Sequence, residues 1–236
     1  MNQYNIKKGF TIIELMLAMA FVAALLLAIA MTVIQIGNIY NRGLTYKDVN
    51  QVGGSLSNEL QRSINGSTPF DLSKMYIDKS WGGRLCTGKY SYIWNYGADI
   101  STNSSNLYKY VDSDVDVIRF VKVIDTGGTY CTDPISRIIR ADAVELIDAS
   151  QNNLALHNFY IGSTSPIPII DDTAFDSKAG QRMYNISFLL GTNEQAALTG
   201  SYVSTACSTE DDNNSNVSYC AVNQFNIVAR AGNTAE

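Results

Sequence analysis

The sequence predicts an α+β protein in which one long N-terminal α-helix packs on an antiparallel β-sheet. Residues 15–34 form an apolar run in which Thr32 is the only polar side chain, about the length that a helix needs to cross a bilayer core. Residues 36–64 continue without proline in an amphipathic pattern of helical period. Beyond them, β-like runs recur at a spacing of about 8–12 residues, which is typical of antiparallel sheets.

The segment before the apolar run is basic. Lys7 and Lys8 precede the run and no acidic residue does, so this end should stay in the cytoplasm while the rest is exported. We interpret residues 1–9 as a leader and exclude them from the fold. An ordinary secretory signal is the main alternative. Its apolar region would span about 7–15 residues, however, and here the small residues that could form its cut site, such as Ala18 and Ala20, lie inside the run.

Glu14 is an acid in the first turns of an otherwise apolar helix. An ionised acid costs about 2.5–3.5 kcal/mol at the centre of a bilayer and less near its surface. After Lys8 the next cation is Arg42, so the sequence offers no nearby charge to compensate it. Either Glu14 lies at the level of the cytoplasmic headgroups, or its partner comes from another copy of the helix.

Gly9, Phe10 and Glu14, set between a short basic leader and the apolar run, resemble the class III signal of type IV pilins and pseudopilins. The resemblance covers about the first forty residues. It implies that a prepilin peptidase cleaves between Gly9 and Phe10 and that Phe10 is then N-methylated. It also implies that Glu14 pairs with the N-terminal amine of a neighbouring subunit during filament assembly, and that the fold is pilin-like.

The chemistry of this cleavage agrees with the resemblance. Removing residues 1–9 creates a cation at Phe10 where the uncut chain has none. Breaking a buried ion pair by removing one partner costs about 3–5 kcal/mol. We therefore expect Glu14 to be tolerated in the precursor and to favour assembly once the neighbouring chains are cut.

We expect four segments: the leader 1–9, a transmembrane or filament-core helix 10–36, its amphipathic continuation 37–64, and an exported β-rich domain 65–236. Glycines within the helix are the expected bending points, and the run that ends at Pro69 should end it. The apolar positions expected to face the domain recur at multiples of four: Tyr40, Leu44, Val52, Leu56, Leu60 and Ile64.

Within the domain, residues 65–105 are expected to form a loosely structured insertion with one strand at 89–96. The other expected strands are 114–124, 135–139, 144–147, 154–161, 183–190 and 223–231. Residues 150–153 should form a hairpin turn between two of these strands, and 163–170 a loop. In the strand 89–96, Tyr90, Tyr92, Trp94 and Tyr96 should share one face. Cross-strand packing explains such a face more simply than a sticky patch for a partner does.

The four cysteines all lie on the exported side, where disulfides are favoured over zinc, because the sequence has no C-x-x-C pair and its one histidine is His157. Four cysteines allow three pairings. The resemblance favours Cys207–Cys220 with Cys86–Cys131, because many pilins have a C-terminal region bounded by a disulfide.

Two acidic clusters suggest a calcium hypothesis, because calcium takes six to eight oxygen ligands and some pseudopilins bind it. The clusters are Asp112, Asp114 and Asp116, and Glu210, Asp211 and Asp212. Neither spacing matches an EF-hand loop, and alternate aspartates of a strand can simply be solvated. We therefore assign no metal and no cofactor.

Charge and motifs argue against two function classes. The net charge is −5, and −7 without the leader (15 basic and 22 acidic residues), which disfavours broad nucleic-acid binding. His157 is most simply a strand residue, and the chain lacks the common hydrolase, zinc-protease and phosphate-loop motifs, so we expect no enzyme.

The predicted function is that of a structural subunit, a minor pilin or pseudopilin. It would be a single-pass protein of the cytoplasmic membrane before assembly and part of an extracellular or periplasmic filament afterwards. Its partners would be the prepilin peptidase, the membrane and other pilin subunits. The alternative is a membrane-tethered binding or adhesion module that never polymerises.

Overall fold

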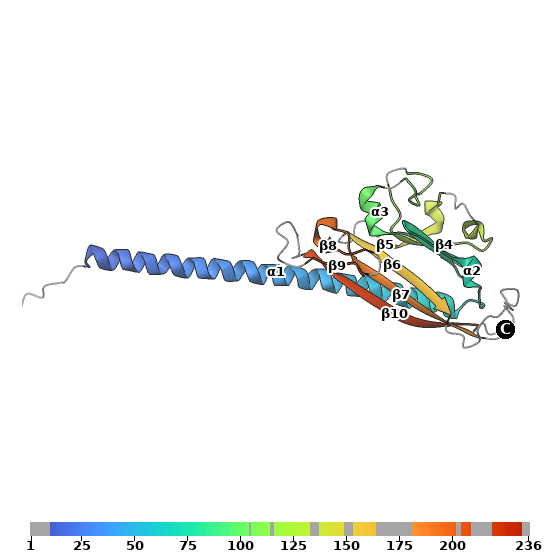
Figure 1. Ribbon diagram of the computed structural model, residues 1–236, viewed down its shortest axis with the longest axis horizontal. Coiled ribbons are helices and arrows are strands. Elements are labelled where there is room, and N and C mark those ends of the chain that lie inside the picture. The colour runs from blue at the N-terminus through green and yellow to red at the C-terminus, as the bar shows by residue number, and fades with distance from the viewer. Residues whose placement is uncertain are drawn as a thin grey trace, which may run out of the picture. The chain divides into compact units, whose positions relative to one another are not determined.

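The dominant element is one helix, α1 (Ile12–Asn65), of 54 residues. In the computed structural model it is unbroken, as Figure 1 shows, and at 1.5 Å per residue it is roughly 80 Å long. The predicted continuity from the apolar run into the amphipathic segment is confirmed. The glycines expected to bend the helix do not interrupt it. The structure describes residues 10–103, 105–113, 116–132, 137–148, 153–163, 181–201, 204–208 and 219–232.

The chain divides into two compact units, Met1–Asn41 and Arg42–Glu236, and each is considered by itself. In the first unit the large apolar side chains of α1 are exposed, from Ile12 at 79% to Ile39 at 72%. Among the described helices, α1 is the one long and apolar enough to cross a membrane. This agrees with a membrane anchor at the N-terminus.

In the second unit α1 buries one stripe of side chains. Leu56, Leu60 and Ile64 enter the main core and Val52 packs at its margin, as predicted. Leu44 is 44% exposed, and so is not part of the buried face; Tyr40, in the first unit, is 66% exposed. The expected stripe is therefore wrong at its N-terminal end. The buried residues of α1 are Thr45, Val49, Gly53, Leu56, Leu60 and Ile64.

A five-stranded antiparallel sheet has the order β1-β2-β3-β4-β5. Its strands are β1 (Tyr76–Lys79), β2 (Gly82–Cys86), β3 (Tyr90–Asn95), β4 (Phe120–Ile124) and β5 (Ala143–Ile147). Short helices accompany it, namely α2 (Leu72–Met75), α3 (Gly97–Thr102), η1 (Thr129–Cys131) and η2 (Arg140–Asp142).

The segment 65–105 is not the loose insertion that we expected, because it contains the first three strands of this sheet. Gly82 and Gly83, in β2, make the segment look like a loop in sequence. The fold requires both: a Cβ on Gly83 would lie 2.6 Å from the Trp94 ring, and one on Gly82 would lie 2.3 Å from the Trp94 carbonyl oxygen. Without side chains at these two positions, Trp94 of β3 can pack directly against β2.

The aromatic face of β3 is core, which confirms the packing interpretation. Tyr92 and Trp94 are fully buried and Tyr96 is 2% exposed. The Trp94 ring stacks on Phe120 at 5.6 Å between centroids and meets Phe159 at 4.4 Å. This cluster fills the space between the five-stranded sheet and the second sheet.

The second sheet has three antiparallel strands in the order β10-β7-β6. They are β6 (Leu154–Ser163), β7 (Arg182–Thr192) and β10 (Val222–Ala231). The hairpin expected at 150–153 is wrong, because β5 and β6 belong to different sheets and β6 pairs with β7. The expected loop 163–170 lies outside the described residues beyond Ser163. A small two-stranded sheet joins β8 (Leu198–Thr199) to β9 (Ala206–Cys207), with η3 (Gln195–Ala197) before it.

Two predicted strands are shorter than expected. β4 begins at Phe120, six residues after the predicted start, and residues 114 and 115 lie outside the described part. The Asn95 side chain explains the late start, because its amide donates to the Tyr108 and Ile118 carbonyls at 2.9 and 2.7 Å. In the predicted strand 135–139, residues 137–139 contribute one isolated bridge, at Ile138.

The helix also covers part of the open edge of β10. Gln61 donates to the Val228 carbonyl oxygen at 3.0 Å, and the Arg230 amide donates to the Asn65 side chain at 2.9 Å. Gln61 and Asn65 are one helical turn apart. Outward-facing backbone groups of an edge strand are thereby satisfied by side chains, which blunts this part of the edge against pairing with another strand.

Gly53 and Gly54 make a matched test of the helix–sheet packing. A Cβ on Gly53 would lie 2.1 Å from the Phe225 ring, whereas one on Gly54 would meet nothing within 4 Å. We expect Gly53→Ala to lower the free energy of unfolding by about 1–3 kcal/mol through overpacking. Gly54→Ala should raise it by up to about 1 kcal/mol through helix propensity. Denaturant unfolding of the full chain in detergent measures both, and equal effects would contradict the packing described.

Candidate functional site

The N-terminus of α1 carries a reciprocal cap formed by Thr11 and Glu14. The Thr11 amide and hydroxyl donate to Glu14 Oε2 at 2.9 and 3.0 Å, and the Glu14 amide donates to Thr11 Oγ1 at 3.3 Å. This is a capping box, in which a Thr before the helix and a Glu three residues later satisfy each other's backbone donors. The Thr-x-x-Glu spacing of this cap is present in the sequence at Thr11 and Glu14.

The cap changes the interpretation of Glu14. The carboxylate has hydrogen-bond partners within its own chain, although none of them is a cation. Both bonds go to Oε2, and no described residue donates to Oε1. One carboxylate oxygen therefore remains available to a donor from outside the chain. Phe10, at the predicted cleavage point, is 88% exposed, and Lys7, Lys8 and Gly9 lie outside the described residues.

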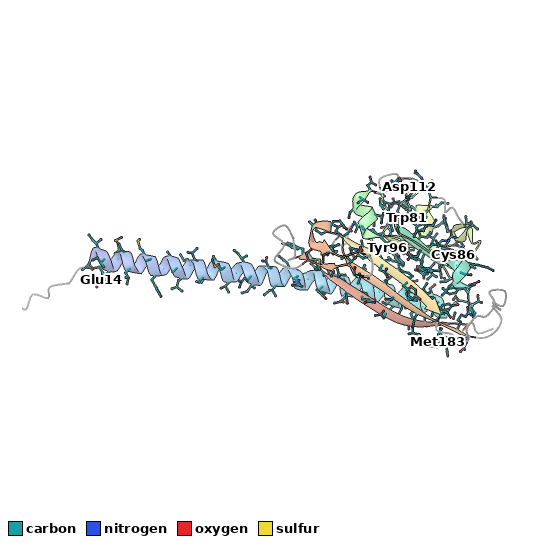
Figure 2. All side chains as sticks on the ribbon, in the orientation of Figure 1. Glu14, Trp81, Cys86, Tyr96, Asp112 and Met183 are labelled. Atoms are coloured by element: carbon teal, nitrogen blue, oxygen red, sulfur yellow. A yellow bond between two sulfur atoms is a disulfide. The ribbon has the colours of Figure 1, made fainter. Side chains whose placement is uncertain are left out.

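Both predicted disulfides are present. Cys86 bonds to Cys131 and Cys207 bonds to Cys220, which leaves no free cysteine. Figure 2 labels Cys86 within the second unit. The first bond ties the end of β2 to η1, and the second closes a loop just before β10. Residues 209–218 of that loop, including Glu210, Asp211 and Asp212, lie outside the described residues.

Asp125 lies next to the first disulfide and completes a set of three potential metal ligands with Cys86 and Cys131. The two sulfurs are bonded to each other, so neither is a thiolate that could bind zinc. The Asp125 carboxylate instead accepts from the Ser91 hydroxyl at 2.7 Å and from the amides of Thr129 and Tyr130 at 2.7 and 3.0 Å. Its role in this geometry is to fix the turn that carries Cys131.

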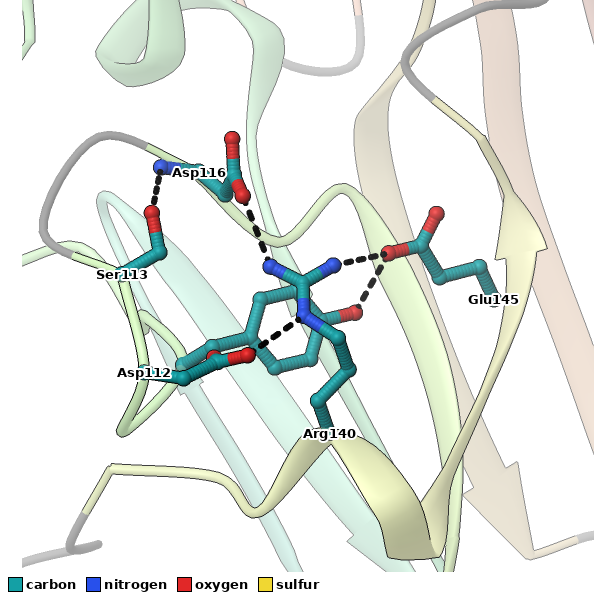
Figure 3. Close-up of polar contacts among 6 residues, drawn as sticks. Asp112, Ser113, Asp116, Arg140 and Glu145 are labelled. Atoms are coloured by element: carbon teal, nitrogen blue, oxygen red, sulfur yellow. Dashed lines mark hydrogen bonds and ion pairs between the residues drawn. The ribbon is translucent and has the colours of Figure 1, made fainter.

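Asp112 and Asp116, two residues of the calcium hypothesis, converge on Arg140 (Figure 3). The Arg140 guanidinium pairs with Asp112 at 3.1 Å, with Asp116 at 2.7 Å and with Glu145 at 3.6 Å. It also lies 4.0 Å above the Tyr110 ring, whose hydroxyl donates to Glu145 at 2.7 Å. Burial first, and then this bond to Glu145, raises the pKa of Tyr110, so its hydroxyl stays protonated.

An organic cation, the guanidinium, thus occupies the place where the hypothesis put a metal. Asp114 lies outside the described residues. In the described part of the chain, the one group of three ligands close enough to hold an ion is the disulfide-blocked set at Asp125. The described members of the first acidic cluster, Asp112 and Asp116, therefore belong to an ion-pair network around an arginine.

A cavity of about 380 Å³ adjoins this network. Its acidic side chains, Asp116, Glu145 and Asp148, outnumber its two arginines. Arg119 is already committed, because it donates to the Leu154 carbonyl and to Asn153 Oδ1. The lining residues are Ile100, Tyr110, Asp116, Val117, Arg119, Arg140, Glu145, Ile147 and Asp148. This cavity could not be predicted from the sequence, because its residues come from separate loops, helices and strands.

The chain was compared with known proteins, and no protein-family model, curated protein or solved structure matched it.

His157 gives the domain a predictable response to acid. It lies in β6 and is 5% exposed, and its Nε2–H donates to the Thr192 carbonyl at 3.1 Å. Burial lowers the pKa of His157 from 6.5 to about 4. Above pH 6.5 the ring is neutral in both the folded and the unfolded chain. As the pH falls from 6.5 to 4, His157 binds a proton in the unfolded chain but stays neutral in the folded chain, so the free energy of unfolding decreases.

Over this window we expect His157 to account for a loss of about 3 kcal/mol. His157→Gln keeps a donor near Thr192 and cannot titrate. The difference in unfolding free energy between the wild-type chain and this variant, measured by denaturant at pH 7 and at pH 4.5, should therefore depend on pH. A difference that is the same at both values would show that His157 does not contribute to acid sensitivity.

Proposed function

We propose that this chain is a structural subunit, a minor pilin or pseudopilin, of a type IV pilus-like filament. In this proposal a prepilin peptidase cuts between Gly9 and Phe10, Phe10 is N-methylated, and the exposed apolar part of α1 joins the helices of other subunits. The observation that carries the proposal is the start of α1. A capped, unbroken helix begins directly after the cleavage motif, and its part within residues 12–41 exposes apolar side chains on all its faces and contains one acid, Glu14.

The exposed apolar surface of α1 can be covered in two successive environments, first the membrane and then a bundle of helices. A helix that is apolar all round is stable in a bilayer or within a bundle of similar helices. In the proposed pathway the membrane covers this surface before assembly, and neighbouring helices cover it afterwards. The β-rich second unit then lies on the exported side, where its two disulfides are expected to form and persist.

Glu14 supports the proposal through charge. Cleavage gives Phe10 an ammonium group, and an adjacent subunit can present that group to the Glu14 carboxylate. The capping box holds the carboxylate in place through Oε2 and leaves Oε1 for the incoming amine. Because the acid is already ordered, the pair forms at a smaller entropic cost.

One observation favours the second candidate, a membrane-tethered binding module that does not polymerise. The cap alone gives Glu14 a structural reason to exist, since losing a helix cap costs about 0.5–2 kcal/mol. In that case Glu14 would serve the helix end of a single chain. The two candidates differ in whether the negative charge of Glu14 is required.

Two substitutions separate the cap from the charge. Glu14→Gln keeps an acceptor at the third helical position, which still suits a capping box, but removes the charge. Glu14→Ala removes both. Under the filament proposal, both variants should insert in the membrane normally, and both should reduce the protein recovered in sheared filaments by tenfold or more, because a buried ion pair has lost a partner.

The measurement is the ratio of sheared to membrane-bound protein on immunoblots, with Thr11→Ser as a control that keeps the cap and the charge. If Glu14→Gln assembles like the wild type while Glu14→Ala does not, the cap is what matters and the charge account fails. If both variants assemble normally, Glu14 has no role in assembly.

A further inference from the structure

The two sulfurs of the Cys86–Cys131 disulfide differ in their access to solvent. Cys86 ends β2 and is fully buried, whereas Cys131 ends η1 and is half-buried. Thiol–disulfide exchange passes through a mixed disulfide and requires access to the sulfur that reacts first. An oxidant that meets the folded, reduced chain therefore reaches Cys131, and Cys86 must complete the bond from inside the domain.

Ser91 and Asp125 lie directly beside this disulfide. The pairing of β2 with β3 places Ser91 opposite Cys86, and its Oγ is 3.3 Å from each of the two sulfurs. The same hydroxyl donates to Asp125 Oδ2 at 2.7 Å, and that carboxylate oxygen is 3.5 Å from Cys131 Sγ. Ser91 is 1% exposed and Asp125 is 4% exposed, so bulk water has little access to the cluster.

The Ser91 hydroxyl has one proton, and the bond to Asp125 uses it. A hydrogen bond to a carboxylate is stronger than one to sulfur, which is a weak acceptor. The contact of 3.3 Å with Cys86 therefore leaves an oxygen lone pair of Ser91 directed at that sulfur. When the two cysteines are reduced, this lone pair can accept the proton of the Cys86 thiol.

Cys86 needs a base, because the thiolate is the form that attacks a disulfide. A free cysteine has a pKa of about 8.5, and apolar surroundings raise the pKa of a thiol further. The charged neighbours of the cluster, Arg84 and Lys89, are cations and cannot take this proton. No ion pair involves Asp125 in the described part of the chain, so its carboxylate is the base within reach.

We propose that Ser91 and Asp125 form a proton relay that closes the Cys86–Cys131 disulfide. The oxidant is a disulfide, R–S–S–R, from the oxidising compartment. The Cys131 thiol exchanges with it to give Cys131–S–S–R and one R–SH. Cys86 Sγ then attacks Cys131 Sγ, while the Cys86 proton passes to Ser91 and the Ser91 proton passes to Asp125. The departing R–S⁻ takes the proton from Asp125, so two thiols are oxidised and R–S–S–R is reduced to two R–SH.

The relay couples oxidation to correct folding of the five-stranded sheet. Three strands each supply one part, because Cys86 ends β2, Ser91 lies in β3 and Asp125 follows β4. The turn through Gly128, which has a φ of 67°, then brings Cys131 back to this corner. A chain whose strands are not paired has no base beside Cys86 and closes the bond slowly. This device would serve a filament subunit and a tethered module alike.

The pH dependence of closure tests the relay in the full-length, reduced chain in detergent. Excess dithiodipyridine, an aromatic disulfide, labels Cys131, and closure is then the phase whose rate does not depend on reagent concentration. Acid-quenched digests read by mass spectrometry follow this bond separately from the Cys207–Cys220 bond. Between pH 6 and pH 8 the wild-type closure rate should change by about threefold or less, because the carboxylate supplies the base.

Ser91→Ala breaks the relay and keeps both amide donors of Asp125, from Thr129 and Tyr130. This variant should close about a hundredfold more slowly at pH 6. Its rate should rise about tenfold per pH unit, because the fraction of free thiolate then sets the rate. Ser55→Ala, which removes an exposed hydroxyl of α1, should behave like the wild type.

Two results from the wild-type chain alone would overturn the proposal, whether or not the variant folds. One is a closure rate that itself rises tenfold per pH unit. The other is a mixed disulfide that forms on Cys86 before Cys131. Closure of Ser91→Ala with the wild-type rate and pH profile would also overturn it, and near-ultraviolet circular dichroism of the reduced proteins verifies that the sheets compared are folded.

Discussion

The packing of α1 against the three-stranded sheet is the interaction on which the rest of the second unit depends. Gly53 has no side chain, and this leaves room for the Phe225 ring. Gln61 and Asn65 form hydrogen bonds with backbone groups at the edge of β10. The helix that makes these contacts continues, without interruption, into a segment whose apolar side chains are exposed. One element thus has two requirements. Its second half must match a sheet in detail, through particular glycines and amides, whereas its first half needs only apolar surroundings of sufficient thickness.

Much of the fold followed from hydrophobic period, because that signal is strong wherever one face is buried. The helix 12–65, β5, β6, β7 and β10 are all close to their predicted positions. The failures have local causes. Gly82 and Gly83 looked like a loop, since nothing in a single sequence shows that Trp94 lies across from them. β4 starts later than predicted because the Asn95 side chain takes the Ile118 carbonyl, which a longer strand would use in its pairing. The predicted hairpin at 150–153 was wrong because turn residues in a sequence do not show which sheet the next strand joins. β6 joins a different sheet from β5.

The candidate sites show the same division between local and long-range information. Glu14 was singled out as an acid in an apolar helix, and its assembly role stays a prediction that the resemblance implies. Its cap with Thr11 could also have been predicted, because the two residues are three positions apart. The cavity beside Arg140 could not, since it joins Asp116, Glu145 and Asp148 with apolar residues from α3 and β5. An arginine that pairs with acidic residues cannot be predicted from their spacing. Arg140 therefore explains Asp112 and Asp116 without calcium, whereas the second acidic cluster lies outside the described residues. The disulfide pairing agreed with the resemblance, which supplied a choice that cysteine count alone leaves open.

The central claim is that the chain is processed at Gly9 and then leaves the membrane within a filament. The most direct test is the mass of the N-terminal peptide from protein sheared off the cell surface. The account predicts a peptide that begins at Phe10 and carries one added methyl group. A low abundance relative to other filament proteins would mark a minor subunit. Full-length protein that begins at Met1 and is confined to membranes would contradict the account and favour a tethered binding module.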